Sequence, residues 1–142
     1  MKVYADTSFL VSLYCLDVHS AKAAQSVGRL QPSLLLTPLT ELELTNALEL
    51  RVFRKEASTA EIRAARTELQ KHIDDGFFVV APMPTMVYEL ARRMALKQTA
   101  VAGTRTLDIL HVASAVLLRA EAFWTFDNRQ AKVAQAEGLK LR

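Results

Sequence analysis

A chain of 142 residues is long enough to bury a sizeable core, and we expect a single domain over residues 1–142. Hydrophobic residues make up 51% and charged residues 23%, which excludes a disordered chain, and no apolar run approaches the roughly 20 residues of a membrane helix. The net charge of +3 favours a polyanionic partner. A lone cysteine excludes an internal disulfide, and Asp6 comes too early for a secretory signal, so we expect a cytoplasmic protein.

Short apolar segments typical of strands recur along the chain, at Lys2–Ala5, Ser33–Thr37, Phe77–Ala81, Ala122–Phe126 and Leu139–Leu141. Helical patterns fill the gaps: from Ser8 as a cap to about Leu16, from Ser20 to Leu30, from Leu39 to Arg54 behind Pro38, from the capping box at 58–61 to about 74, from Pro84 to Gln98, from Leu107 to Ala120 with Thr106 as a cap, and from Arg129 to Glu137. Four to five short strands alternating with about seven helices predict an α/β fold with a central parallel sheet covered on both faces. Ligands of such sheets bind beyond the carboxyl ends of the strands.

Three aspartates are expected at that edge of the sheet. Asp6 directly follows the first predicted strand in VYADTSFL, where an unpartnered buried carboxylate would cost roughly several kcal/mol. Asp127 follows the fourth strand in FWTFDNRQA, and Thr125 points to the same side because strand side chains alternate. Asp108 lies in the first turn of the apolar helix in RTLDILHVASA. A role as a helix cap or turn residue remains the alternative for each of these acids.

The helix that contains PLTELELTNALEL offers three glutamates as a fourth acid. Glu43 stands between two leucines, with Asn46 one turn later on the same face. Glu41 lies in the first turn, where a carboxylate also suits the helix dipole. Glu49 is interpreted as a solvated surface residue, so Glu43 is preferred and Glu41 is kept as the alternative.

Four carboxylates at one edge of a sheet would repel one another unless a divalent cation lies between them. Ligands that are all oxygen favour Mg²⁺ or Mn²⁺ over zinc. The histidines, His19, His72 and His111, have no partner at the spacing of a zinc site. An ion of this kind lowers the pKa of a bound water and holds a phosphate oxygen, as phosphoryl chemistry requires.

Three further residues flank the expected site. His111 lies one turn after Asp108 on the same face, and we interpret it as a packing or hydrogen-bonding residue rather than a general base. Arg105 and Arg129 either contact substrate phosphates or pair with nearby carboxylates.

Four stretches of the chain resemble the PIN-domain ribonucleases, and most closely the VapC-type toxins of toxin–antitoxin pairs. They are YADTSFLVSL, ELELTNAL, TRTLDILHVASA and WTFDNRQAKVAQAEGLKL, which stand in the expected order and are spread over nearly the whole length of the chain. The resemblance implies a PIN-like three-layer fold and a metal-dependent endoribonuclease. In it, Asp6, Glu43, Asp108 and Asp127 are the catalytic acids that bind Mg²⁺ or Mn²⁺.

The reaction implied by the resemblance is hydrolysis of an RNA phosphodiester by a metal-activated water, which leaves a 5′-phosphate and a 3′-hydroxyl. Ser8 and Thr125 occupy positions where these proteins often carry a hydroxyl that orients waters or a carboxylate. The resemblance also implies a homodimer and an antitoxin partner whose tail covers the active groove. The alternative function is a non-catalytic PIN-like module that binds nucleic acid or protein without cutting.

Overall fold

Five short parallel strands form the centre of the fold, which the computed structural model describes over residues 1–142. The strands are β1 (Lys2–Ala5), β2 (Ser33–Leu36), β3 (Phe78–Val80), β4 (Ala122–Trp124) and β5 (Lys140–Leu141). Their order in the sheet is β3-β2-β1-β4-β5, and every neighbouring pair is parallel. The predicted parallel sheet is therefore confirmed, with β1 in its middle.

Seven helices connect and cover the strands, as predicted. They are α1 (Thr7–Tyr14), α2 (Ser20–Leu30), α3 (Pro38–Phe53), α4 (Thr59–Asp74), α5 (Val87–Ala102), α6 (Thr106–Leu117) and α7 (Asn128–Ala136). None of these helices has the combination of length and hydropathy that crossing a lipid bilayer requires.

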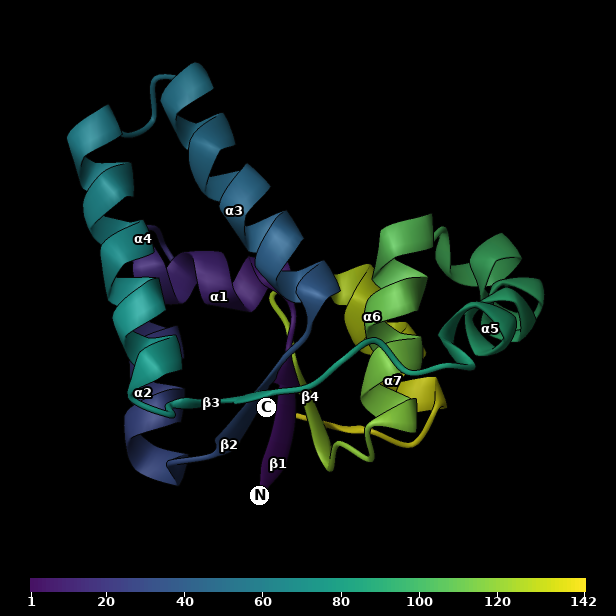
Figure 1. Cartoon of the computed structure of the whole chain (residues 1–142). Coiled ribbons are helices and arrows are strands. Elements are labelled where there is room, and N and C mark those ends of the chain that lie inside the picture. Colours follow the sequence, from purple (N-terminus) through teal and green to yellow (C-terminus); the bar gives the residue numbers. More distant parts are fainter.

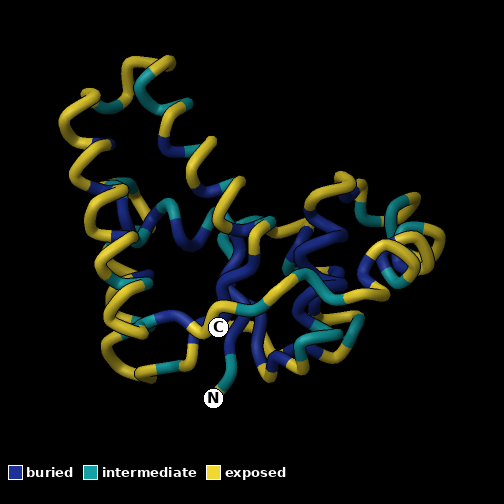
Figure 2. The backbone as a smooth tube through the Cα atoms, in the orientation of Figure 1, coloured by how far each residue is buried: buried dark blue, intermediate teal, exposed yellow.

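The two faces of the sheet carry separate cores because side chains alternate along each strand. Val3 and Ala5 of β1 belong to the core that α1–α4 cover, whereas Tyr4 between them belongs to the core that α5–α7 cover. Figure 1 shows the first four helices on one side of the sheet and the last three on the other. In Figure 2 the buried residues concentrate in the sheet and in α6, while the far turns of α3 and α4 are exposed. This arrangement is the predicted three-layer α/β fold.

The predicted cap of α1 is wrong. Asp6 is the N-cap, because the chain leaves β1 there with extended backbone and the Asp6 carboxylate accepts the backbone N–H of Phe9 at 3.0 Å. Ser8 lies one residue inside the first turn of α1. The carboxylate at the end of the strand is thus built into the start of the following helix.

Two other helix starts also differ from the prediction. Thr106 is the first residue of α6 rather than its cap; Arg105 occupies the cap position with extended backbone, and its N–H donates to the Asp108 carboxylate at 3.2 Å. Pro84 does not open α5, because it begins a turn in which the N–H of Val87 donates to the Pro84 carbonyl at 3.1 Å. As a result, α6 begins one residue earlier than the apolar pattern predicts, and α5 begins three residues later.

The carboxyl ends of β1, β2 and β4 meet at one edge of the sheet. Asp6, Thr37 and Thr125 follow these strands directly. Thr37, predicted as part of β2, instead caps α3 by accepting the N–H of Thr40 at 3.2 Å. This edge is where the candidate site forms.

Candidate active site

Asp6 is a fully buried carboxylate at the centre of this edge. Its Oδ1 accepts hydrogen bonds from the Ser8 hydroxyl at 2.7 Å and from the Phe9 N–H at 3.0 Å, and its Oδ2 accepts one from the Thr125 hydroxyl at 2.6 Å. Burial raises the pKa of Asp6, and the donors from Thr125, Phe9 and Ser8 offset only part of that rise. These donors explain how a buried carboxylate is tolerated at the end of β1.

The two hydroxyls singled out in the sequence connect Asp6 to the loop after β4. Thr125 Oγ1 accepts the backbone N–H of Asp127 at 2.9 Å, and Ser8 Oγ accepts that of Phe126 at 2.9 Å. The start of α7 is consequently fixed relative to the start of α1, although the two segments are far apart in the sequence.

Glu43 extends from α3 toward α1 and α6. Its Oε2 accepts hydrogen bonds from His111 Nε2 at 2.8 Å and from the Thr7 hydroxyl at 3.2 Å. Partial burial raises the pKa of Glu43, but the hydrogen bond and charge of His111, together with Thr7 and the nearby Arg105, lower it more, and the net pKa lies below its ordinary value. Glu41, the alternative, is exposed on α3.

His111 is the hydrogen-bonding residue of α6 that the sequence suggested. It is 1% exposed, and its Nδ1 lies 2.9 Å from the Tyr4 hydroxyl, which in turn lies 3.0 Å from the hydroxyl of Thr40. A carboxylate only accepts, so Nε2–H of His111 donates to Glu43, while Nδ1 is hydrogen-bonded to the Tyr4 hydroxyl. This chain of hydrogen bonds joins β1, α3 and α6 beneath the site.

Asp108 lies in the first turn of α6 and is only 4% exposed. Its Oδ2 accepts both the backbone N–H and the Nε–H of Arg105, at 3.2 and 3.1 Å. The hydrogen bond and charge of Asp108 raise the pKa of Arg105, and the charges of Asp127 and Glu43 add to this rise. The guanidinium of Arg105 therefore lies among three of the four acids.

Asp127 is the N-cap of α7, the role that the sequence left open for it. Its Oδ1 accepts the backbone N–H groups of Arg129 at 2.8 Å and Gln130 at 3.2 Å. The Nε of Arg129 lies 4.0 Å from the same oxygen, and its side chain is 52% exposed. A cap role leaves Oδ2 of Asp127 without a protein hydrogen bond, so capping and ligand binding are compatible.

Three of the four acids line one groove. Glu43, Asp108 and Asp127 contribute to a groove of about 930 Å³, bounded by α1, α3, the start of α6 and the loop after β4. Asp6 lies behind this wall, and Ser8, which donates to it, is part of the wall. The groove also has Asn46 and three arginines, Arg51, Arg54 and Arg105, but not Arg129. The structure thus brings together the predicted acids with cations that suit a polyanion.

The sequence matches the family model of the PIN domain over residues 3–136. The chain belongs to the PIN-domain family. No curated protein matches it significantly. The match spans nearly all of β1, with Asp6 behind it, and the whole of α7, so it includes every acid described above.

Solved structures share the fold of this PIN domain at low sequence identity. VapC20 of Mycobacterium tuberculosis, a Sarcin–Ricin loop cleaving toxin, has a TM-score of 0.72 at 16% identity, over 96% of this chain and 95% of that one. FitAcB of Neisseria gonorrhoeae has a TM-score of 0.71 at 14% identity, over 98% and 95% of the two chains. VapBC2 of Rickettsia felis, bound to a DNA fragment from its promoter, has a TM-score of 0.70 at 12% identity, over 100% and 98%. The PIN-like fold extends over the whole chain.

The donor chemistry of the groove fits Mg²⁺ or Mn²⁺, since carboxylate oxygens predominate and no thiolate is present. The side chains as they lie do not form a ligand cluster: no three Asp, Glu, His or Cys residues are grouped for one cation. Asp108 is engaged by Arg105, Glu43 by His111 and Thr7, and Asp6 by its own donors. The acids of this PIN domain are gathered at one place and each is held by a protein donor.

Gln130 is a groove residue that the sequence interpretation missed. It is 5% exposed, and its Oε1 is the one buried side-chain oxygen or nitrogen without a hydrogen-bond partner. A free buried acceptor is unusual, because leaving it unpaired costs roughly 1–3 kcal/mol. The sequence did contain a signal for Gln130: it lies three residues after Asp127, which places the two side chains on the same face of a helix.

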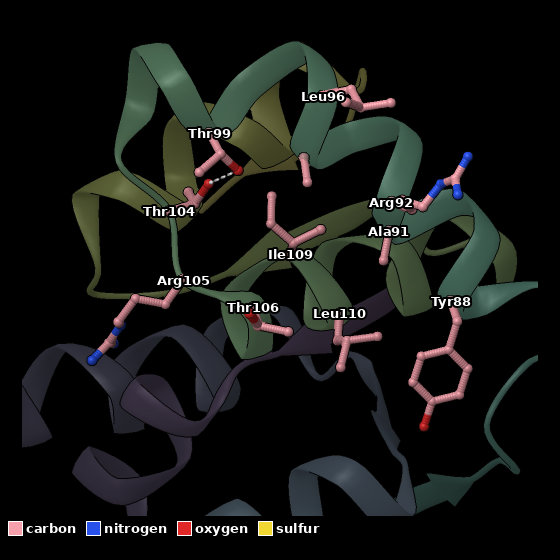
Figure 3. A pocket seen from close by; sticks show the side chains of 11 residues that line it. Tyr88, Ala91, Arg92, Leu96, Thr99, Thr104, Arg105, Thr106, Ile109 and Leu110 are labelled. Atoms are coloured by element: carbon pink, nitrogen blue, oxygen red, sulfur yellow. Dashed lines mark hydrogen bonds between the residues drawn. The ribbon is translucent and has the colours of Figure 1, made fainter.

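A second cavity lies between α5 and α6 and differs chemically from the groove. It has a volume of about 530 Å³ and is lined by side chains such as Ala91, Leu96, Ile109 and Leu110, with no carboxylate among them. Figure 3 shows Ala91, Ile109 and Leu110 around this cavity and Leu96 at its outer edge, while the guanidinium of Arg105 points away from them. This cavity lacks the groups that phosphodiester chemistry needs.

Proposed function

We propose that this PIN domain is a metal-dependent endoribonuclease, the toxin component of a toxin–antitoxin pair. The observation that carries the proposal is the convergence of Glu43, Asp108 and Asp127 on one groove, with Asp6 buried behind its wall. Asp6, Asp108 and Asp127 each stabilise the start of a helix, but helix capping does not require these acids and Glu43 to meet at one place, and three of the four lie beside arginines that suit phosphate. The same resemblance to VapC-type toxins that named these acids in the sequence supports the choice of RNA.

Asp6, Glu43, Asp108 and Asp127 would hold Mg²⁺ or Mn²⁺, which supplies a water of lowered pKa and neutralises charge on the phosphate. The protein's own residues have three tasks. Ser8 and Thr125 orient the Asp6 carboxylate, and their hydrogen bonds offset part of the rise that burial causes in its pKa. His111 and Thr7 orient Glu43, and Arg105 offers a largely exposed guanidinium to a substrate phosphate.

The proposed antitoxin occupies the same groove. Apolar side chains are exposed at its rim: Leu42 lines the groove and is 68% exposed, and Leu16 and Val18 follow α1 with 92% exposure each. Apolar groups beside arginines fit a protein segment that carries both apolar and acidic side chains. Such a segment would cover the acids and block RNA.

The resemblance also leads us to propose a homodimer that acts in the cytoplasm. In support of a second copy, α5 leaves large apolar side chains in solvent: Tyr88 is 71%, Leu96 77% and Val101 90% exposed. Sedimentation of the purified chain tests this assembly, and a monomer at all concentrations would refute the proposed homodimer.

The function itself is tested by incubating purified protein with total RNA in Mg²⁺, in Mn²⁺ and in EDTA, beside the variant Asp108→Asn. Asparagine keeps an acceptor for the Arg105 N–H, so we expect a folded variant that does not cut. Cleavage by the wild type that is lost both in EDTA and in the variant supports the nuclease. RNA binding without cutting under every condition would instead support the non-catalytic module.

A further inference from the structure

A pair of stacked rings lies in the wall of the groove that contains the acids. The ring of His19 lies on that of Phe126, with centroids 4.3 Å apart and planes 9° from parallel. Phe126 also stacks on buried Phe9 at 5.4 Å, and the guanidinium carbon of Arg142 lies 4.3 Å from the Phe126 centroid. The rings thus form a series that runs from the core, through half-buried Phe126, to exposed His19.

The carboxylate of Asp17 helps to hold the loop that carries His19 in place. Asp17 accepts the backbone N–H of His19 at 2.8 Å, the hydroxyl of Ser12 at 2.8 Å and Nη2 of Arg51 at 3.3 Å. The imidazole itself has no hydrogen bond to another side chain. The His19 ring is therefore held in position, and its stack on Phe126 leaves the imidazole available to bind a ligand.

Phe126 is fixed from the opposite direction. Its backbone N–H donates to Ser8 Oγ at 2.9 Å, and Ser8 in turn donates to Asp6. Asp127 is the next residue in the chain, and both Phe126 and Asp127 line the groove. A molecule held by the rings is consequently held next to the proposed reaction centre.

The surroundings of the rings match an unpaired nucleotide. His19, Phe126, Arg51 and Arg54 all line the same groove, so flat ring surface and positive charge occur together. Single-stranded nucleic acid is bound by this combination, in which bases stack on aromatic planes while cations contact phosphates. The antitoxin segment proposed above also pairs with these arginines, whereas the parallel rings specifically suit the flat face of a base.

We propose that His19, supported by Phe126, is a stacking subsite for an unpaired nucleobase adjacent to the bond that is cut. This proposal rests on the proposed nuclease function. It adds that the RNA substrate carries an unpaired base next to the bond that is cut. Purines, which offer the larger stacking surface, bind it better than pyrimidines.

The test uses a short oligouridine RNA with one 2-aminopurine, a base whose fluorescence falls when it stacks. Binding is titrated in EDTA with the Asp108→Asn background, so that no cleavage occurs. We expect the probe to be quenched by protein with His19, to remain quenched with His19→Phe, and to lose quenching with His19→Ala. The affinity should fall about 10-fold in His19→Ala, the scale of one base–aromatic stack. Gln25→Ala, a change at an exposed position of α2 that does not line the groove, is the control and should bind as the parent does.

Equal quenching and affinity in His19→Ala would overturn the subsite and leave the ring pair as a contact for a protein. Loss in His19→Phe as well as in His19→Ala would also overturn it, because the effect would then come from the imidazole nitrogens and not from its plane. Thermal unfolding of each variant verifies that the exposed substitution leaves the fold intact. The binding titration does not depend on cutting. If the wild type cleaves no RNA, the proposed nuclease function is refuted, while base stacking on His19 is still tested by the titration.

Discussion

Nε2 of His111 lies 2.8 Å from Oε2 of Glu43, across the gap between α6 and α3. The contact joins residues 68 positions apart and fixes which glutamate of α3 faces the groove. Glu41, one half-turn away, is exposed and has no such partner. The contact with His111 therefore distinguishes Glu43 from Glu41. From the sequence alone, Glu43 was preferred only because its neighbours are apolar.

Glu43→Gln should reduce RNA cleavage roughly 100-fold, because it removes a ligand charge from the groove and alters the acceptor for His111. Glu41→Gln on the same helix should leave the rate within about twofold, as expected for an exposed residue. Initial cleavage rates at saturating Mg²⁺ compare the two. The reverse order would mean that the helix contributes Glu41 instead.

Arg105→Gln should weaken RNA binding roughly 10-fold, since a charge-assisted contact to phosphate is lost. Arg129→Gln is the matched control, because Arg129 is an exposed arginine that does not line the groove, and its effect should be several-fold smaller. Filter binding in EDTA measures both. Equal losses would show that the arginines act only through the overall charge.

Gln130→Met should raise the free energy of unfolding by about 1 kcal/mol, because it removes a buried acceptor that has no partner. The same change should lower RNA cleavage if the acceptor serves a water or substrate hydroxyl in the groove. Gln135→Met, at an exposed position of α7, provides the comparison for stability. A destabilised Gln130→Met protein would indicate that the oxygen is satisfied by solvent.

Asp17→Asn should destabilise the fold at neutral pH by about 1 kcal/mol, since hydrogen bonds to a charged acceptor are weakened. Burial raises the pKa of Asp17, but hydrogen bonds from Ser12 and the His19 N–H, with the charge of Arg51, bring the net pKa below its ordinary value. A depressed folded pKa means that the stabilisation is present above the unfolded value of about 4 and is lost as the pH falls through the folded value. Urea unfolding from pH 7 to pH 3 should therefore show the two proteins converging at the acid end. A constant difference across this range would contradict the assignment.

The sequence was most informative where a pattern repeats locally. Short apolar segments predicted β1 and its neighbours, and the place of Asp6 at the ligand-binding edge followed from the parallel topology. Helix ends were less accurate at Ser8, Thr106 and Pro84, because a cap depends on which backbone N–H groups remain free after the preceding turn. The contact of Glu43 with His111 could not be predicted, since it depends on how two helices approach across the sheet edge.

The hydrogen bond from Thr125 to Asp6 joins residues 119 positions apart, and Glu43 and Asp108 come from two segments in between. No short fragment of the chain therefore contains the groove. For a protein proposed to damage RNA, this ties cutting to the nearly finished chain: a nascent chain that has not yet reached Asp127 lacks part of the groove.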